Sequence, residues 1–407
     1  MTKTKVPFSP PMITEEMIAE VVDTLRSGWI TTGPKTKRLE QELTNYVGSK
    51  KTLCVGSATQ GMELMLRWFG VGEGDEVIIP AYTYCATANV VMHVGAKPVM
   101  VDISPADLCL DIEAVRKAIT PKTKAIIPVD LGGLPAMQQA LIEIAESAKG
   151  EFKPKTDNQK AFGRIMVMTD AAHSIGAKVN GKMVGSISDA TVFSFHAVKN
   201  LTTAEGGAIA FNLPAQFNHD EVYKWCNTMS LHGQSKDALA KTQLGQWRYD
   251  VIQPGHKSNM TDIQASLGLV QLKDYGSILN RRKEVFAQYD QAFSGDERFI
   301  CPLSNLDGRE SSCHFYALRL NGFLEQDRGT LIDLMAGEGV SANVHYLPLP
   351  MLSAYRNLGY EINDYPMAKK VFEAEITLPV FNGMTNEQVC IVIDTLKASL
   401  NKIESEK

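Results

Sequence analysis

Short apolar runs rich in valine and isoleucine alternate with segments of helical periodicity along the first half of the chain. This alternation is typical of a mostly parallel sheet, because parallel strands need crossover helices between them. It predicts strands at Thr52–Val55, Glu76–Ile79, Pro98–Val101, Ala125–Val129, Ile165–Thr169, Ala190–Phe195 and Ala208–Phe211. Helices are predicted at Gly61–Phe69, Thr87–Val94, Ile112–Ile119 and Met137–Ser147. We therefore expect an α/β fold with a central, mostly parallel sheet.

Turn-forming residues mark further boundaries. A helix is predicted to begin after the capping residue Thr14 and to end at Gly28. The next segment, SGWITTGPK at Ser27–Lys35, contains too many turn formers and β-branched residues to stay helical. The polar stretch Gly150–Gly163 is expected to be an exposed loop extension, and the sequence assigns it no role.

The pattern changes after Phe211 to longer amphipathic segments, notably Asp262–Leu272 running on toward Tyr289. Strand-like runs follow at Phe315–Leu320 and Ser341–His345. We expect a large α/β domain at residues 1–255 and a smaller α+β domain at residues 256–407.

Composition excludes several classes of protein. The 407 residues carry 41 Lys and Arg against 46 Asp and Glu, a net charge of -5, so no basic excess indicates a nucleic-acid partner. The 7 cysteines are scattered, which argues against a zinc site or a disulfide framework and favours a reducing compartment. No stretch approaches the roughly 20 apolar residues of a membrane span. We expect a cytoplasmic protein of small-molecule chemistry, with no metal.

The motif TDAAHS at Thr169–Ser174 places Asp170 where a predicted strand ends. Ligands of open α/β sheets bind at the carboxyl edge of the strands, so this carboxylate is a candidate for a site. Taken alone, an aspartate at such a position more often caps the following turn.

A lysine follows the next predicted strand, in the motif FSFHAVKN at Phe193–Asn200. An isolated loop lysine is usually solvated. A buried lysine beside an electron-poor cofactor instead has a lowered pKa, and its neutral amine can form an imine. Pyridoxal phosphate requires such a lysine together with an acid that keeps the pyridine nitrogen protonated. Lys199 and Asp170 supply both groups.

A phosphate cradle is the third element. The motif GSATQG at Gly56–Gly61 follows a strand and opens a helix, so Ser57, Ala58 and Thr59 lie at a helix N-terminus, which attracts anions. Ser194 could add a hydroxyl. The alternative is that Ser57 only caps the helix.

These elements, in this order, resemble the DegT-type (DegT/DnrJ/EryC/StrS) family of sugar aminotransferases over nearly the whole chain. The stretches that carry the resemblance are SGWITTGPK, GSATQGMELML, GEGDEVIIPAYTYCATANV, GAKPVMVDI, ITPKTKAIIPVDLGG, TDAAHSIGA, FSFHAVKNLTTAEGGAI, PGHKSNMTDIQASLGLVQL and VHYLPLP. The resemblance implies the fold of aspartate aminotransferase, known as fold type I.

The resemblance also implies roles for individual residues. It makes Lys199 the imine lysine, Asp170 the partner of the pyridinium, and Ala58, Thr59 and Ser194 the phosphate holders. Tyr84 falls where the family stacks an aromatic residue on the cofactor ring, and His173 falls at the other ring face. His196 and His232 are left as structural residues.

Two positions depart from the family pattern. Many relatives have glycine-aromatic-Asn-aromatic-Arg where this chain has Gly255–Asn259, so either Lys257 or Asn259 could reach the phosphate of a partner subunit. We favour Asn259. Pro350 stands where the family often has a second histidine in VHYLPLP.

Among the family's reactions, the resemblance favours transfer of an amino group from L-glutamate to a nucleotide-linked 4-keto-6-deoxy sugar, with UDP as the favoured nucleotide. The products would be 2-oxoglutarate and a 4-amino sugar for a surface polysaccharide or glycan, made by a homodimer with shared active sites. Amination at carbon 3 stays open. Lys199 argues against the related sugar dehydratases, which carry histidine there.

Two readings from other classes are weaker. A nicotinamide-dependent oxidoreductase would need a glycine-rich fingerprint after its first strand, but in GVGEGD the third glycine position is Asp75 and the segment precedes its strand. A catalytically silent regulator of the same fold would be expected to lose Lys199 or Asp170, and both are present.

Overall fold

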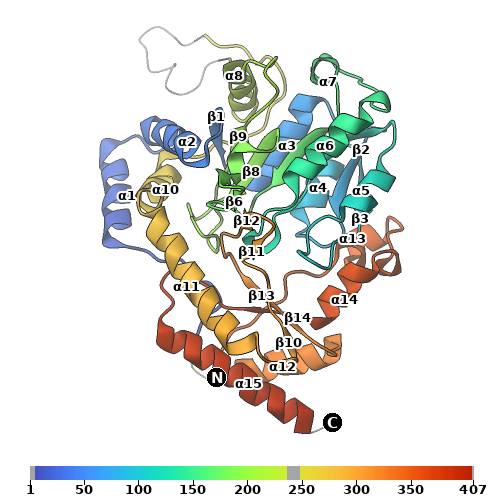
Figure 1. Cartoon of the computed structure of the whole chain (residues 1–407). Coiled ribbons are helices and arrows are strands. Elements are labelled where there is room, and N and C mark those ends of the chain that lie inside the picture. The colour runs from blue at the N-terminus through green and yellow to red at the C-terminus, as the bar shows by residue number, and fades with distance from the viewer. Residues whose placement is uncertain (1–4, 236–247, 406–407) are drawn as a thin grey trace.

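The computed structural model describes residues 5–235 and 248–405, and its centre is a seven-stranded sheet (Figure 1). The strand order is β1-β9-β8-β5-β4-β2-β3. β9 runs antiparallel to β1 and β8, whereas the pairs β8/β5, β5/β4, β4/β2 and β2/β3 are parallel. The strands are β1 Lys51–Val55, β2 Glu76–Pro80, β3 Lys97–Val101, β4 Thr123–Ile126, β5 Met166–Asp170, β8 Ala190–Ser194 and β9 Gly207–Phe211.

All seven predicted strands are present, and the prediction of a mostly parallel sheet is confirmed. β4 ends at Ile126, before the predicted Val129, which makes a single parallel bridge to Asp170. The sheet is buried on both faces, since successive residues of β9 belong to different clusters of core side chains. Ile209 packs in one cluster, whereas Ala208 and Ala210 pack in the other.

Helices cover both faces of this sheet. α3 and α4, which pack on each other, contribute apolar side chains to one face, and α2 and α10 contribute them to the other (Figure 1). The helices of this part of the chain are α1 Glu15–Ser27, α2 Pro34–Val47, α3 Ala58–Phe69, α4 Ala86–His93, α5 Ile112–Ala118, α6 Gln138–Ser147, α7 Asp157–Phe162, α8 His219–Met229 and α10 Asp262–Lys273. Thr14 and Gly28 cap α1 at its two ends, as predicted.

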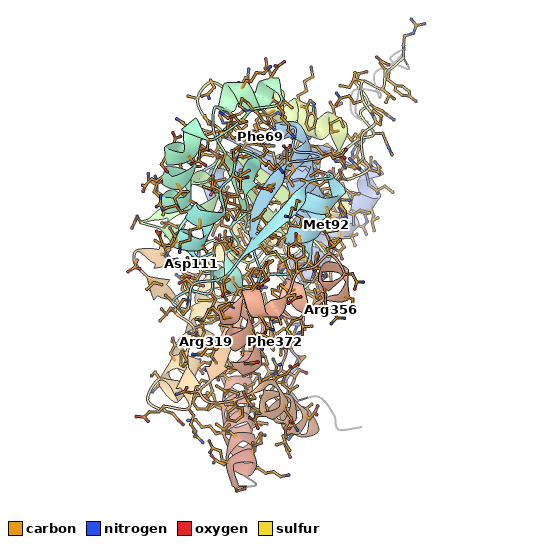
Figure 2. All side chains as sticks on the ribbon, turned by 90° about the vertical axis from the view of Figure 1, so that its right-hand side faces the viewer. Phe69, Met92, Asp111, Arg319, Arg356 and Phe372 are labelled. Atoms are coloured by element: carbon orange, nitrogen blue, oxygen red, sulfur yellow. The ribbon has the colours of Figure 1, made fainter. Side chains whose placement is uncertain are left out.

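A second group of elements lies below the central sheet in Figure 1. It is built on a three-stranded antiparallel sheet, β10 Phe299–Ile300, β13 Tyr316–Leu320 and β14 Glu375–Leu378. The remaining α-helices of the described chain are α11 Tyr275–Phe293, α12 Glu325–Gly337, α13 Ser353–Arg356, α14 Pro366–Ala374 and α15 Asn386–Ser405. In the side view of Figure 2, Arg319 and Phe372 lie below Phe69 and Met92. The expected smaller α+β part is therefore present.

The division of the chain at residues 255 and 256 stays a prediction, and the packing of two segments bears on it. α10 lies after this boundary but packs on α1 and α2, and its Leu269 belongs to the core beneath the large sheet. Conversely, Val6 near the N-terminus is fully buried in the apolar cluster of the small sheet and pairs with Val340. The part of the fold around the large sheet therefore includes a segment from the C-terminal half, and the part around the small sheet includes a segment from the N-terminus.

The polar stretch 150–163 was predicted to be an exposed loop, and this prediction is wrong. It contains α7, which Thr156 caps at the start and Gly163 at the end. Phe162 is buried, and its ring packs edge-on against Phe69 at 5.0 Å between centroids. Thr156 Oγ1 donates to Phe69 O at 3.3 Å, and Gln159 Nε2 donates to Gly70 O at 3.1 Å. The stretch satisfies carbonyl groups that the C-terminus of α3 would otherwise leave unpaired.

Two other predictions need correction. The run Ser341–His345 forms no strand and makes only one bridge, between Asn343 and Thr377 of β14. The long helical segment from Asp262 is broken at Asp274, which separates α10 from α11.

The remaining strands form a small four-stranded sheet in the order β11-β12-β6-β7. They are β6 Lys178–Val179, β7 Lys182–Met183, β11 Asn305–Leu306 and β12 Arg309–Glu310. Within residues 5–235 and 248–405, no helix is long and apolar enough to cross a membrane.

Candidate active site

A cavity of about 470 Å³ opens where β5 and β8 end and α3 begins. This is the carboxyl edge of the parallel strands, where α/β sheets bind ligands. Eight of the residues singled out from the sequence line it: Ser57, Ala58, Thr59, Tyr84, Asp170, His173, Ser194 and Lys199. The strand ends thus gather side chains that are far apart in the sequence.

Asp170 is the last residue of β5, and its side chain is held by the neighbouring helix. Thr87 Oγ1 donates to Asp170 Oδ2 at 2.9 Å, and the backbone N–H of Ala172 donates to Oδ1 at 3.2 Å. Burial raises the pKa of Asp170, while these hydrogen bonds and the charge of Lys199 oppose the rise. The carboxylate is therefore fixed in position and lacks full charge compensation, which favours binding of a cationic group.

Lys199 follows β8 in a tight turn, with its N–H donating to His196 O at 2.9 Å. Burial lowers the pKa of its amine to about 8, and the negative charge of Asp170 partly opposes this shift. A pKa of 8 leaves about one amine in ten neutral at pH 7, against fewer than about one in a thousand for an ordinary lysine. Lys199 can therefore act as a nucleophile and a base near neutral pH.

The start of α3 forms a concave backbone surface beside β9. Ser57 adopts an extended conformation, and its Oγ accepts from Gln60 N at 3.2 Å, so it does cap the helix. A Cβ on Gly207 would lie 2.6 Å from Ala58 N and 2.7 Å from Phe193 O. Only glycine lets β9 approach the first turn of α3 so closely, and Ser57, Ala58 and Thr59 at this turn line the cavity.

Aromatic side chains form one wall of the cavity. The ring of Tyr84, which is 59% exposed, lies 5.7 Å from that of Tyr346 between centroids. His173 is buried, with its ring stacked on His314 at 4.5 Å. Tyr346 and His314 come from the C-terminal part of the chain, whereas Tyr84 and His173 come from the N-terminal part, so both parts of the chain contribute to the wall.

Several residues of the site were not singled out from the sequence. Thr87 of α4 does not line the cavity but bonds Asp170, and it had no signal beyond its place in the motif PAYTYCATANV. His196, for which the sequence predicts a structural role, lines the cavity with its Nε2 3.6 Å from Glu205 Oε1. Tyr346 had no signal beyond its place in VHYLPLP. His232 does not line this cavity.

Lys257 and Asn259 do not line the cavity of their own chain. Asn259 pairs with Val55 at the end of β1, and its Nδ2 donates to Thr32 Oγ1 at 2.6 Å. Lys257 lines a separate hollow beside Gln60 on the outer side of α3. Which of the two would reach a partner's phosphate stays a prediction.

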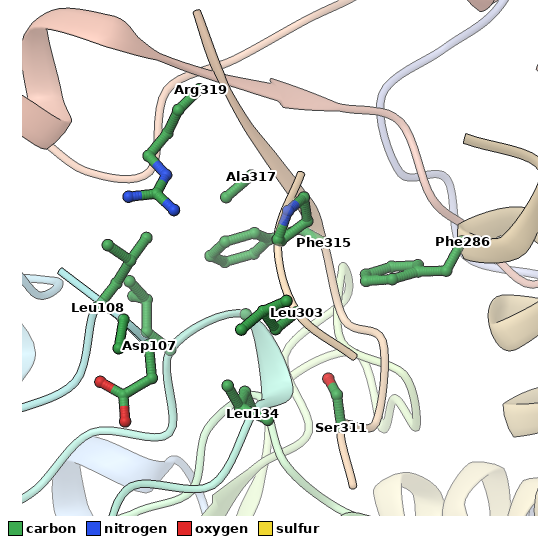
Figure 3. A pocket seen from close by; sticks show the side chains of 13 residues that line it. Asp107, Leu108, Leu134, Phe286, Leu303, Ser311, Phe315, Ala317 and Arg319 are labelled. Atoms are coloured by element: carbon green, nitrogen blue, oxygen red, sulfur yellow. The ribbon is translucent and has the colours of Figure 1, made fainter. Parts of the chain in front are cut away.

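A smaller cavity of about 40 Å³ is lined by side chains that include Leu108, Leu134 and Ala317 (Figure 3). Phe315 lines it, and the same ring stacks on His345 at 4.7 Å on the active-site side. Asp107 at its edge is already bound to Arg309 at 2.6 Å. Phe315 thus lies between the two cavities, and the smaller one is lined by loops of the large-sheet part together with α11 and β13.

Comparison with protein families decides the identity of this fold and site. A model of the DegT/DnrJ/EryC1/StrS aminotransferase family matches residues 11–397. The chain belongs to this family. Its predicted membership and its pyridoxal-phosphate cofactor are thereby confirmed.

Relatives of this DegT-family chain extend over nearly its full length. An uncharacterised protein of Methanocaldococcus jannaschii, MJ1066, is 38% identical over 403 residues, which cover 98% of this chain and 97% of the relative. The spore coat polysaccharide biosynthesis protein SpsC of Bacillus subtilis is 35% identical over 399 residues, 96% of each chain.

Solved structures confirm fold type I. Spr1654 from Streptococcus pneumoniae, described as a candidate sugar aminotransferase and solved in its PMP form, is 49% identical with a TM-score of 0.95, covering 98% of this chain and 100% of that one. PseC from Helicobacter pylori, an aminotransferase of pseudoaminic acid biosynthesis, is 26% identical with a TM-score of 0.85 and covers 98% and 100%.

The cavity of this DegT-family aminotransferase fits the cofactor chemically. The N–H groups at the start of α3 suit a phosphate, the Asp170 carboxylate suits a protonated pyridine nitrogen, and the Lys199 amine suits an aldehyde.

Proposed function

We propose that this aminotransferase transfers an amino group from L-glutamate to carbon 4 of a nucleotide-linked 4-keto-6-deoxy sugar, with UDP as the favoured nucleotide. The observation that carries the proposal is the joint presence of the Lys199 amine, the Asp170 carboxylate and the α3 N-terminus in one cavity. These three groups serve the three functional parts of pyridoxal phosphate.

The roles proposed for the residues follow from their chemistry. Bound pyridoxal phosphate supplies an electron sink that stabilises negative charge on the substrate carbon. Asp170 holds the proton of the pyridine nitrogen through its negative charge. Ser57, Ala58, Thr59 and Ser194 bind the phosphate, and Tyr84 and His173 contact the ring faces.

Lys199 moves the proton in both halves of the reaction. Its Nζ would take the proton from the alpha carbon of the amino acid donor in the first half, and it would return a proton to the sugar carbon when the keto sugar is aminated. The neutral fraction implied by its pKa of about 8 makes one amine competent as both base and acid.

The sugar substrate is supported by the relatives. Spr1654 is described as a candidate sugar aminotransferase, SpsC as a spore coat polysaccharide biosynthesis protein, and PseC as an aminotransferase in pseudoaminic acid biosynthesis. A 4-amino sugar destined for a surface polysaccharide or glycan is consistent with all three names. Seven unpaired cysteines support a reducing cytoplasm as the place of reaction.

Amination at carbon 3 is the alternative within the same chemistry. Product analysis tests it: the purified enzyme is supplied with glutamate and, separately, with the UDP-linked 4-keto and 3-keto isomers, and each product is identified by NMR. We expect turnover of the 4-keto sugar. Turnover of the 3-keto isomer alone would overturn the assignment to carbon 4.

Spectroscopy tests the role of Lys199. The holoenzyme should show an absorbance band of the lysine-bound cofactor that borohydride abolishes, and the variant Lys199→Ala should lack this band before any amine is added. A band that persists in Lys199→Ala would exclude this lysine as the covalent partner.

We also propose a homodimer in which Asn259 of one subunit reaches the phosphate site of the other. The side chain faces away from the cavity of its own chain, toward Thr32, which is compatible with a role toward a second copy. Lys199→Ala and Asn259→Ala proteins are each expected to be inactive. Mixed heterodimers should regain activity, because one of their two sites is intact. No regain despite demonstrated subunit exchange would refute the shared site.

A further inference from the structure

A tyrosine hydroxyl from the C-terminal part of the chain meets a histidine of the active-site wall. Tyr346 lines the cavity, and its hydroxyl lies 3.1 Å from His173 Nε2. The two rings are nearly parallel, with 22° between their planes and 6.2 Å between centroids. Tyr346 therefore joins His173 to the space that a ligand would occupy.

The ring of His173 is held from behind by a second histidine with a defined tautomer. His314 stacks on His173 at 4.5 Å and 22°, and its Nδ1 lies 2.8 Å from Asn200 Oδ1. Asn200 uses its Nδ2 to donate to Ser312 O at 2.9 Å, so its Oδ1 is the acceptor and His314 Nδ1 carries the hydrogen. Asn200 directly follows Lys199, so these hydrogen bonds connect the His314 ring to the loop that carries the Lys199 amine.

Both histidines and the tyrosine are in their neutral forms. Burial, together with the charge of Lys199, holds the pKa of His173 and of His314 well below the usual value. Burial raises the pKa of Tyr346 above its ordinary value. The pair of Tyr346 and His173 therefore holds two hydrogens, one on the hydroxyl and one on the imidazole.

Only one of these two hydrogens can lie in the hydrogen bond between Tyr346 and His173, so the other needs a different acceptor. If Tyr346 donates to Nε2, the imidazole hydrogen sits on Nδ1, which is buried and has no acceptor in the described chain. If Nε2–H donates to the tyrosine oxygen, the hydroxyl hydrogen is free, and it belongs to a residue that lines the cavity. The second arrangement costs less, because a buried N–H without an acceptor is rarer than an acceptor without a donor.

We propose that Tyr346 donates a hydrogen bond to an oxygen of the bound ligand, and that His173 Nε2–H orients the tyrosine for this contact. His314 and Asn200 are positioning residues that fix the plane of the His173 ring. The inference rests on the proposed function only in that the ligand is the cofactor or a substrate of this site. Oxygen acceptors exist on both, and the experiment distinguishes them.

The first test uses the variant Tyr346→Phe, which removes the hydroxyl and keeps the ring, with Tyr289→Phe as the matched control. Tyr289 is a buried tyrosine of the small-sheet core whose hydroxyl donates to Pro379 O. The absorbance of each holoenzyme is titrated with pH, and KM is measured for glutamate and for the keto sugar in separate half-reactions.

If the acceptor is a cofactor oxygen, the pH midpoint of the absorbance change in Tyr346→Phe shifts by at least about half a pH unit from that of the wild type. Both KM values then stay within about twofold of the wild-type values. If the acceptor is a substrate oxygen, the band is unchanged and KM for that substrate rises about five- to tenfold, the effect of one lost hydrogen bond. Unchanged absorbance and unchanged KM values would overturn the proposal.

The second test addresses the orienting role and does not depend on Tyr346→Phe folding. A glutamine at position 173 places its amide nitrogen near the location of the histidine Nε2, whereas an asparagine is too short. His173→Gln should therefore depart less from the wild type than His173→Asn does in whichever readout Tyr346→Phe moves. Equal behaviour of the two variants would refute the orienting role. Lys199→Ala serves as the independent check of the proposed function, because it alone abolishes the lysine-bound band.

Discussion

The lowered pKa of Lys199 predicts that this residue destabilises the apoenzyme. Burial brings the pKa to about 8 from the ordinary 10.5, so the unfolded chain binds the lysine proton more tightly than the folded chain does. The penalty is fully present below pH 8 and disappears as the pH rises toward 10.5. Lys199→Met, which removes the charge and keeps the length, should therefore stabilise the apoenzyme at neutral pH.

The magnitude follows from the two pKa values. At pH 7 the protonated amine costs about 3 kcal/mol of folding free energy, and at pH 9.5 it costs about 1.4 kcal/mol. The advantage of Lys199→Met over the wild type should thus shrink by roughly 2 kcal/mol between these pH values. Differences in packing between lysine and methionine add a constant that does not depend on pH.

Urea unfolding of the cofactor-free proteins at pH 7 and pH 9.5, at one protein concentration, measures this change. The exposed Lys153→Met serves as the control and should show the same small difference at both pH values. The comparison is repeated in an Asp170→Asn background. Because the charge of Asp170 raises the pKa of Lys199, its loss should increase the folding free energy that the protonated Lys199 amine costs at pH 7. A difference between Lys199→Met and wild type that is independent of pH would refute the reasoning.

Three further predictions concern the supports of the site. Asp170→Asn should fold normally but lose at least about 100-fold in the rate of the glutamate half-reaction, followed by the change in cofactor absorbance; near-native rates would remove Asp170 from the mechanism. Gly207→Ala should weaken cofactor binding at least about tenfold by equilibrium dialysis, because its Cβ would lie 2.6 Å from Ala58 N, whereas Gly150→Ala, with open space around it, should bind normally. Equal affinities of these two variants would contradict the close-approach argument. Gln159→Ala should cost about 2 kcal/mol in urea unfolding, because Gln159 is fully buried and bonded to Gly70 O, and a loss below about 0.5 kcal/mol would show that α7 contributes little to stability.

The local pattern of residues was sufficient for the strands and for the principal chemical groups. Buried parallel strands have apolar side chains on both faces, so the runs that became β5 and β8 were visible without any knowledge of their neighbours. Asp170 and Lys199 were also visible, because each stands at the end of such a run and strand ends of a parallel sheet meet at one edge.

Other elements depended on contacts that no local pattern contains. The stretch 150–163 looked like a polar loop, but Gln159 and Phe162 find partners at the far end of α3 and become helical and buried there. Ser341–His345 had the composition of a strand, but it makes only one bridge to β14. Local propensity was overridden in both places by tertiary packing.

The active site likewise combines features that the sequence predicts with contacts that only the tertiary structure creates. The sequence by itself determined the parallel sheet, the lysine, the acid and the helix start that suits a phosphate, because each depends on residues close together along the chain. Only the tertiary structure decided that Tyr346 meets His173 across 173 positions of sequence, and that His314 stands behind it. Contacts of this kind arise from the way the N-terminal and C-terminal parts of the chain pack on each other, and that packing depends on the whole core.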